Sequence, residues 1–210
     1  MPDPPDHVAE PQAVYQASPP SATYQDVLDA PPGKTAQIID GELVLSPRPG
    51  PPHVQAASVL GMELGPFVLG HGRGGGLGGW WILDEPELHL GDDVLVPDLA
   101  GWRRERMPRF PTTAWFDLAP DWVCEVLSPS TASDDRVRKA RIYAREGVRH
   151  LWILDPLARM LEVLELREGY WVLVQAFAGK ETVRARPFDA VELEMERWWI
   201  PEPRPVDQPG

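Results

Sequence analysis

Residues 121–127, DWVCEVL, constrain the fold of this chain more than any other segment. In a β-strand successive side chains point to opposite faces, so Glu125 shares one face with Val123 and Leu127, and the other face is wholly apolar. A strand that is apolar on both faces is typical of the centre of a sheet that is covered on both sides. The chain is therefore predicted to form a sheet with helices packed on it.

The rest of the chain alternates helical and strand patterns. Helices are expected at residues 24–29, 53–70 and 135–147. Strands are expected at residues 36–47 (a hairpin), 80–90, 94–102, 121–127, 150–156, 160–166 and 170–177. The apolar stripe of the helix at 53–70 is formed by Val54, Ala57, Leu60, Leu64 and Val68. The Asp40-Gly41 pair is a strong signal for a two-residue hairpin turn. The order predicts an α/β fold with a mixed β-sheet flanked by helices.

One folded domain is expected over residues 22–200, between two disordered ends. Residues 1–21 hold six prolines and few large apolar groups, which is typical of a disordered leader, and residues 201–210 form a similar tail. Neither a signal peptide nor an apolar run long enough for a transmembrane helix is visible, so we expect a cytoplasmic protein with no membrane partner. The lone cysteine, Cys124, excludes an internal disulfide framework and a cysteine-based zinc site.

Two carboxylates occupy segments that are otherwise apolar. Glu125 lies in the doubly apolar strand, where an unpaired carboxylate costs several kcal/mol, so it must be neutralised, paired with a cation or bound to a metal. Asp98 poses the same problem in the strand expected at 94–102, where Pro97 indicates an edge or a bulge. The alternative for each carboxylate is a salt bridge to a nearby arginine: Arg103, Arg104 or Arg106.

Two carboxylates on neighbouring strands suit Mg²⁺ or Mn²⁺, because like charges tolerate proximity when a cation lies between them. Such an ion polarises a phosphoryl oxygen and lowers the pKa of a bound water, which suits phosphodiester hydrolysis. The helix at 135–147 places Asp135, Lys139 and Tyr143 on one stripe, at i, i+4 spacing, and a lysine near the metal can orient that water. The alternative is an ordinary surface ion pair between Asp135 and Lys139.

Four segments carry a resemblance to a known family. They are GELVLSPRPGPPH (41–53), VPDLAGW (96–102), VCEVLSPST (123–131) and DRVRKARIYAREGVRHLWILDP (135–156). In this order they resemble the Uma-two family of restriction endonucleases, which belongs to the PD-(D/E)XK nuclease superfamily. The resemblance covers about residues 24–178, most of the expected domain.

The resemblance implies a restriction-endonuclease-like core and Mg²⁺-dependent cleavage of phosphodiester bonds in nucleic acid, with DNA as the expected substrate. Asp98 falls on the family's PD aspartate and Glu125 on the acidic residue of its second motif. The superfamily lysine belongs two residues after the glutamate, where this chain has Leu127, and the family pattern assigns its role to Lys139. Many nucleases of this fold pair up to cut two strands, so a homodimer is expected by analogy.

Four further residues are expected near the pocket: Glu42 and His53 from their family positions, Glu87 from its strand, and Tyr143 from the stripe shared with Lys139.

The net charge of −12 opposes a dedicated nucleic-acid binder, because phosphate neutralisation supplies most non-specific affinity. Positive charge is nevertheless clustered. Residues 103–109 hold four arginines, and residues 136–149 hold five arginines together with Lys139. Such asymmetry permits a local basic groove on an acidic protein. The expected nucleic-acid contacts are Arg103, Arg104, Arg136 and Arg138.

The leading hypothesis is a Mg²⁺-dependent endonuclease in which Asp98 and Glu125 bind the metal and Lys139 orients the attacking water. An alternative is a nucleic-acid-binding or interaction module on the same fold that has lost cleavage, which Leu127 and the acidic composition favour. A third is a metal-dependent hydrolase of a small phosphate ester, which would not depend on the arginine clusters.

Overall fold

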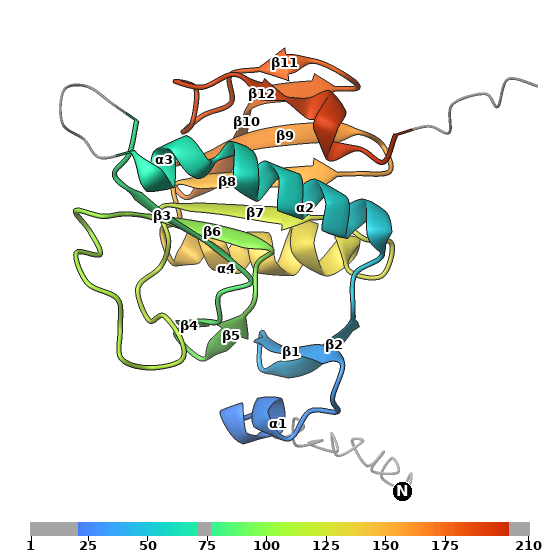
Figure 1. Cartoon of the computed structure of the whole chain (residues 1–210). Helices are drawn as coiled ribbons and strands as arrows, with labels where there is room; N and C mark the ends of the chain where they lie inside the picture. Colours follow the sequence, from blue (N-terminus) through green and yellow to red (C-terminus); the bar gives the residue numbers. More distant parts are fainter. Residues whose placement is uncertain (1–20, 71–76, 202–210) are drawn as a thin grey trace, which may run out of the picture.

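A six-stranded sheet forms the centre of the computed structural model, which describes residues 21–70 and 77–201. Its strands lie in the order β10-β9-β8-β7-β6-β3 (Figure 1). Their bounds are Trp80–Asp84 (β3), Leu99–Arg103 (β6), Trp122–Val126 (β7), His150–Asp155 (β8), Met160–Arg167 (β9) and Tyr170–Ala178 (β10). Strands β7 and β8 run parallel and the other neighbours antiparallel, so the mixed sheet is confirmed.

A smaller antiparallel sheet adjoins the first, with the order β2-β1-β5-β4. Its strands are Lys34–Ile39 (β1), Glu42–Pro47 (β2), Leu88–Leu90 (β4) and Asp93–Leu95 (β5). The predicted hairpin of β1 and β2 is confirmed. Asp40 and Gly41 both have positive φ, 53° and 78°, as a two-residue turn of this kind requires.

The prediction of one strand over residues 94–102 is wrong. Strand β5 ends at Leu95 and pairs with β1 and β4, whereas β6 begins at Leu99 and pairs with β3 and β7. The segment between them contains Pro97, which has no N–H to donate to a ladder. Asp98 therefore lies where the chain crosses from one sheet to the other.

The segment 80–90 is also two strands, not one. It divides into β3 and β4 at Glu85, whose φ of 45° is left-handed, and at the proline that follows. The two halves again belong to different sheets.

Helices cover both faces of the large sheet (Figure 1). Helices α2 (Pro51–Glu63) and α3 (Gly65–Leu69) lie on one face, where Leu60 packs in the same apolar cluster as Trp122. A π-helical segment η1 (Asp134–Lys139) continues into α4 (Ala140–Arg145) on the other face, where Tyr143 clusters with Val123. All five residues of β7 are buried, which confirms that it is covered on both sides.

The helix predicted over 53–70 is present as α2 and α3, with an interruption at Leu64. Its predicted stripe is wrong in part, because Val54 is 47% exposed. The residues that face the sheet are His53, Ala56, Leu60, Leu64 and Phe67. Two neighbouring helical stripes fit this sequence, and the packing selects the one that begins at His53.

Several short elements complete the structure. Helix α1 is Tyr24–Leu28, and the chain after β10 forms β11 (Thr182–Val183), β12 (Leu193–Glu194) and a 3₁₀ turn η2 (Met195–Trp198). No helix in the described part of the chain is long and apolar enough to cross a membrane. The leader and tail predicted at 1–21 and 201–210 lie outside the described residues, apart from Ser21 and Pro201.

Candidate active site

Glu125 extends from β7 into the layer between the large sheet and helix α4, with 1% of its surface exposed. The hydroxyl of Tyr143 donates to its Oε1 at 2.6 Å. The ammonium of Lys139 donates to both carboxylate oxygens, at 3.2 Å and 3.0 Å. The carboxylate is therefore buried but compensated by one cation and one hydroxyl, as a buried charge requires.

Lys139 and Tyr143 lie on the predicted stripe together with Asp135. The Nζ atom of Lys139 is 3.0 Å from Asp135 Oδ1, and both side chains are almost fully buried. The alternative of a surface ion pair is therefore wrong. Residues 134–139 form a π-helical turn, a rare conformation that occurs frequently at functional sites. The ammonium of Lys139 therefore lies between two buried carboxylates, that of Asp135 on the same helix and that of Glu125 on β7.

Asp98 reaches the same region from the crossing between the sheets. Its Oδ2 accepts the backbone N–H of Val126 at 2.6 Å, which ties it to the end of β7. Its Oδ1 lies 3.0 Å from Nε2 of His53, in the first turn of α2. The Nδ1 atom of His53 is buried and has no hydrogen-bond partner among the described residues.

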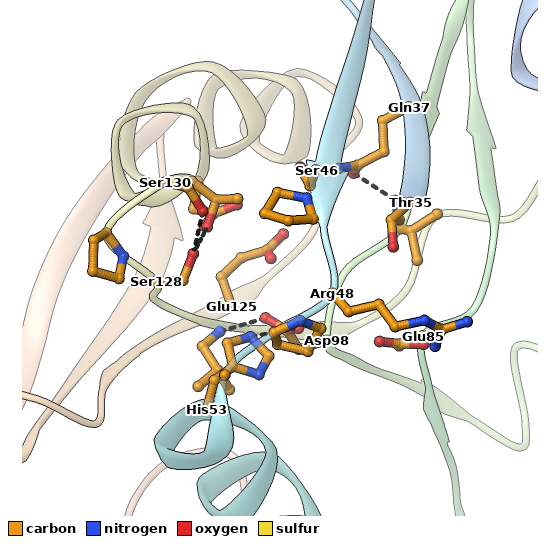
Figure 2. A pocket seen from close by; sticks show the side chains of 18 of the residues that line it. Thr35, Gln37, Ser46, Arg48, His53, Glu85, Asp98, Glu125, Ser128 and Ser130 are labelled. Atoms are coloured by element: carbon orange, nitrogen blue, oxygen red, sulfur yellow. Dashed lines mark hydrogen bonds and ion pairs between the residues drawn. The ribbon is translucent and has the colours of Figure 1, made fainter. Parts of the chain in front are cut away.

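Asp98, Glu125 and Lys139 line one pocket of about 190 Å³ (Figure 2). Its walls come from both sheets, from the start of α2 and from the loop after β7. Polar lining residues include Thr35, Gln37, Ser46, Arg48, Glu85, Ser128, Ser130, Thr131 and Asp135. The structure therefore brings together the three residues predicted as catalytic, along with His53.

The pocket is lined by more acidic side chains than basic ones. Burial raises the pKa of Glu125 to about 8, against the opposing effect of Lys139. Burial lowers the pKa of Lys139, but the carboxylates of Glu125 and Asp135 outweigh it and raise that pKa above its ordinary value. Burial also lowers the pKa of His53, and its hydrogen bond to Asp98 then raises it above the usual range. Once Glu125 has lost its proton, three carboxylates beside one lysine favour the uptake of a further cation.

The donor atoms of this pocket fit a hard divalent ion. Counting the described residues, each oxygen of Asp98 has one partner and Oε2 of Glu125 accepts from Lys139 alone, so each keeps a lone pair. No group of three or more His, Cys, Asp or Glu side chains within 21–70 and 77–201 is arranged to hold a metal by itself. Mg²⁺ commonly binds through one or two carboxylates, with water and substrate phosphate in the other positions.

Two of the residues expected near the pocket lie elsewhere. Glu87 accepts from the hydroxyl of Tyr24 and pairs with His89, each at 2.8 Å, and does not line the pocket. Glu42 is exposed at the start of β2, where it pairs with Arg138. Tyr143 contacts Glu125 from behind, without lining the pocket itself.

Of the four arginines expected to contact nucleic acid, three form polar contacts with the protein and the fourth, Arg103, stacks on an aromatic ring. Arg136 pairs with Glu162 at 2.5 Å, and Arg138 is held by Glu42 and by the carbonyl of Ile39. The arginines that end and follow β6 lie away from the pocket: Arg103 stacks over Trp80, and Arg104 donates to the carbonyls of Trp80 and Val68. None of these four arginines lines the pocket of Asp98.

Other lining residues carry signals too weak to select from sequence. Glu85 follows a strand and looks like a solvated acid, and Arg48 is one of 17 arginines. Ser128, Ser130 and Thr131 are of residue types that are common in loops and at helix starts, so their sequence does not mark them as functional. Their hydroxyl oxygens are 3.0 Å apart in the pairs Ser128–Ser130 and Ser128–Thr131, at the edge of the pocket.

The mixed sheet with helices on both faces, and the acidic pocket where β6 begins and β7 ends, define an α/β protein with a nuclease-like fold. A crystal structure described as a putative nuclease belonging to DUF820, from Anabaena variabilis, has a similar fold. The TM-score is 0.64 at 20% sequence identity, over 84% of this chain and 97% of that one. A search of curated proteins gives no match.

The sequence profile of the Uma2 family, described as "Putative restriction endonuclease", matches residues 22–196. The chain therefore belongs to the Uma2 family, as its four motifs predict.

Proposed function

We propose that this chain is a Mg²⁺-dependent endonuclease that hydrolyses phosphodiester bonds in DNA. The observation that carries the proposal is the convergence of Asp98 and Glu125, from the adjoining ends of two strands, in one pocket with Lys139. Membership of a family described as restriction endonucleases supports the same reaction class.

Asp98 and Glu125 would hold the ion, which, when bound, polarises a phosphoryl oxygen and acidifies a water molecule. The chain fixes both carboxylates in advance. The N–H of Val126 and the imidazole of His53 orient Asp98, and the hydroxyl of Tyr143 orients Glu125. Fixed ligands of this kind reduce the reorganisation that the reaction needs.

Lys139 takes the role of orienting the attacking water. Its ammonium has three N–H donors, and the carboxylates of Glu125 and Asp135 accept from two sides. Its two longest contacts are to Oε1 of Glu125, at 3.2 Å, and to the carbonyl of Val96, at 3.5 Å, so the N–H group that serves them can turn to a water in the pocket. The charge of Lys139 stays in place because the two carboxylates raise its pKa, although burial lowers it.

The pocket wall offers donors to a substrate phosphate. Ser130 and Thr131 contribute hydroxyls, and Arg48 lies at the pocket with no ion pair among the residues that the structure describes. Figure 2 shows Arg48 on one side of Glu125 and Asp98 and the loop of Ser128 and Ser130 on the other side. A phosphodiester held between them would present its phosphorus to the carboxylates.

The test is nicking of supercoiled plasmid and cleavage of single-stranded DNA by the full chain, with Mg²⁺, with Mn²⁺ and with chelator. Asp98→Asn should abolish cleavage, while Glu87→Gln, a matched change outside the pocket, should leave it intact. Equal cleavage by the wild type and Asp98→Asn would refute the assignment of the site.

The alternative is a module that binds nucleic acid without cutting it. Two observations favour it: Leu127 stands where the superfamily has its lysine, and Lys139 is already engaged by Glu125 and Asp135. In that case the wild type would bind DNA in Mg²⁺ or Mn²⁺ without cleaving it.

A further inference from the structure

The two arginine clusters of the sequence meet in a second pocket, of about 460 Å³. Arg103 and Arg106 come from the first cluster, and Arg149 ends the second. The pocket also contains His150 and two carboxylates, Glu105 and Asp121. Neither the nuclease proposal nor the family resemblance uses this pocket.

This second pocket lies at the other end of strand β6 from the candidate active site. Asp98 precedes β6, and Arg103 is its last residue. At about 3.3 Å per residue, the five steps between them span roughly 16 Å. The two pockets share no lining residue.

Of the three guanidiniums in this pocket, two have no carboxylate partner among the described residues. Arg106 pairs with Asp121 at 2.8 Å, and Asp121 also accepts the backbone N–H of Arg103. Asp121 is therefore occupied. Within residues 21–70 and 77–201, the side chains of Arg103 and Arg149 form no ion pair, and Glu105 is the remaining carboxylate of the pocket. An acidic protein thus keeps a local surplus of positive charge.

Arg103 is held in a fixed orientation. Its guanidinium carbon lies 4.1 Å from the centre of the Trp80 ring, and the ring itself is buried. Stacking occupies the face of the guanidinium and leaves the N–H groups at its edge free to donate. A planar fork of this kind matches the oxygens of a phosphate better than a lysine does.

His150 supplies an unsatisfied polar atom. Its Nδ1 is buried and has no hydrogen-bond partner among the described residues. Buried polar atoms without a partner are uncommon and disfavoured, so such an atom calls for an explanation. His150 also lines the pocket, so its imidazole can contact a ligand that binds there.

We propose that this second pocket binds a phosphate group, carried by a nucleotide or by a nucleic-acid strand. Arg103 and Arg149 donate to its oxygens, and His150 adds a third contact. Three donors suit a tetrahedral phosphate with several oxygens better than a carboxylate with two. The proposal stands apart from the nuclease assignment, because no residue of the Asp98 pocket takes part.

The test measures binding to the full chain in chelator, so that no metal recruits phosphate to the Asp98 pocket. One probe is inorganic phosphate, followed by calorimetry, and the other is a short fluorescein-labelled single-stranded oligonucleotide, followed by anisotropy. Arg149→Glu and Arg103→Gln should each weaken binding about tenfold or more, the usual worth of a charged hydrogen bond. Arg109→Glu is the matched control, because Arg109 is exposed in the same cluster but does not line this pocket.

Each result separates one explanation from another. Binding of both probes would indicate a site for free phosphate groups, and binding of the oligonucleotide alone would indicate the backbone of a strand. Asp98→Asn should bind as the wild type does, which keeps this test independent of cleavage. Equal weakening by Arg109→Glu and Arg149→Glu, or no binding of either probe up to about 10 mM, would overturn the proposal. Thermal melts of all variants show whether each is folded.

Discussion

Replacing Lys139 by methionine would remove the cation that separates Glu125 from Asp135. Both carboxylates are at most 3% exposed in their side chains, so neither gains hydration when the ammonium is lost. Breaking a buried ion pair by removing one partner costs about 3–5 kcal/mol. In a domain of this size, about 2–4 °C per kcal/mol then gives a melting temperature lowered by roughly 6–20 °C.

The assay is urea unfolding in chelator, followed by tryptophan fluorescence. Lys180→Met is the control, since Lys180 pairs with Glu196 at the surface and such pairs contribute about 0–1 kcal/mol. The loss in Lys139→Met should shrink as the pH falls. Lys139 lowers the pKa of Glu125, so its removal raises that pKa further in the folded state. A carboxyl whose pKa is higher in the folded than in the unfolded state destabilises the fold at high pH, where it must ionise, and this cost disappears as the pH falls and the carboxyl is protonated. A loss below about 1 kcal/mol, or one independent of pH, would refute the reasoning.

Three other predictions follow from the same geometry. Tyr143→Phe removes the hydrogen bond to buried Glu125 and should lower the free energy of unfolding by about 1.5–3 kcal/mol in urea titrations. Gly101→Ala would place a methyl group 3.1 Å from the ring of Trp122 and should cost about 1–3 kcal/mol in thermal melts, whereas Gly65→Ala meets no atom within 4 Å and should be tolerated. Mg²⁺ should bind more tightly as the pH rises toward about 8, because the protonated carboxyl of Glu125 must lose its proton first. Calorimetry in two buffers of different ionisation enthalpy measures that release, and its absence at neutral pH would contradict the prediction.

The buried strand and the helical stripe are the parts that sequence could predict, for a physical reason. A period of two fixes which side chains share a face of β7, so Glu125 had to lie on the face opposite Trp122. The i, i+4 spacing of Lys139 and Tyr143 keeps them on one stripe whether the turn is α-helical or π-helical. Both patterns are local, and tertiary packing left them unchanged.

The crossing at Asp98 could not be predicted from local pattern. Pro97 marks an irregularity, but the sheet that each half joins depends on partners far along the chain, as when Val94 pairs with Ile38. The arginines show a second limit. Arg103 is five residues from Asp98 in sequence, and because the strand between them is extended, those five residues carry it to the far end of the sheet.

His53 shows a third limit. A lone histidine at the start of a helix is commonplace, and its partner Asp98 lies 45 residues further along the chain. Only the family position indicated it. The packing of α2 on the sheet keeps Leu60 and Leu64 of the predicted stripe buried but buries His53 in place of Val54, and His53 contacts Asp98.

Because the chain crosses between two sheets at Asp98, the pocket has one wall from each sheet. On the wall from the large sheet, Glu125 and Lys139 are buried, with Tyr143 buried behind them, so substitutions there disturb folding. The opposite wall, from Thr35 to Arg48, comes from a hairpin of the small sheet whose second strand is largely exposed. Relatives can therefore diverge in that hairpin at little cost to stability. We expect substrate preference within the family to track residues 34–48, while the acidic centre stays the same.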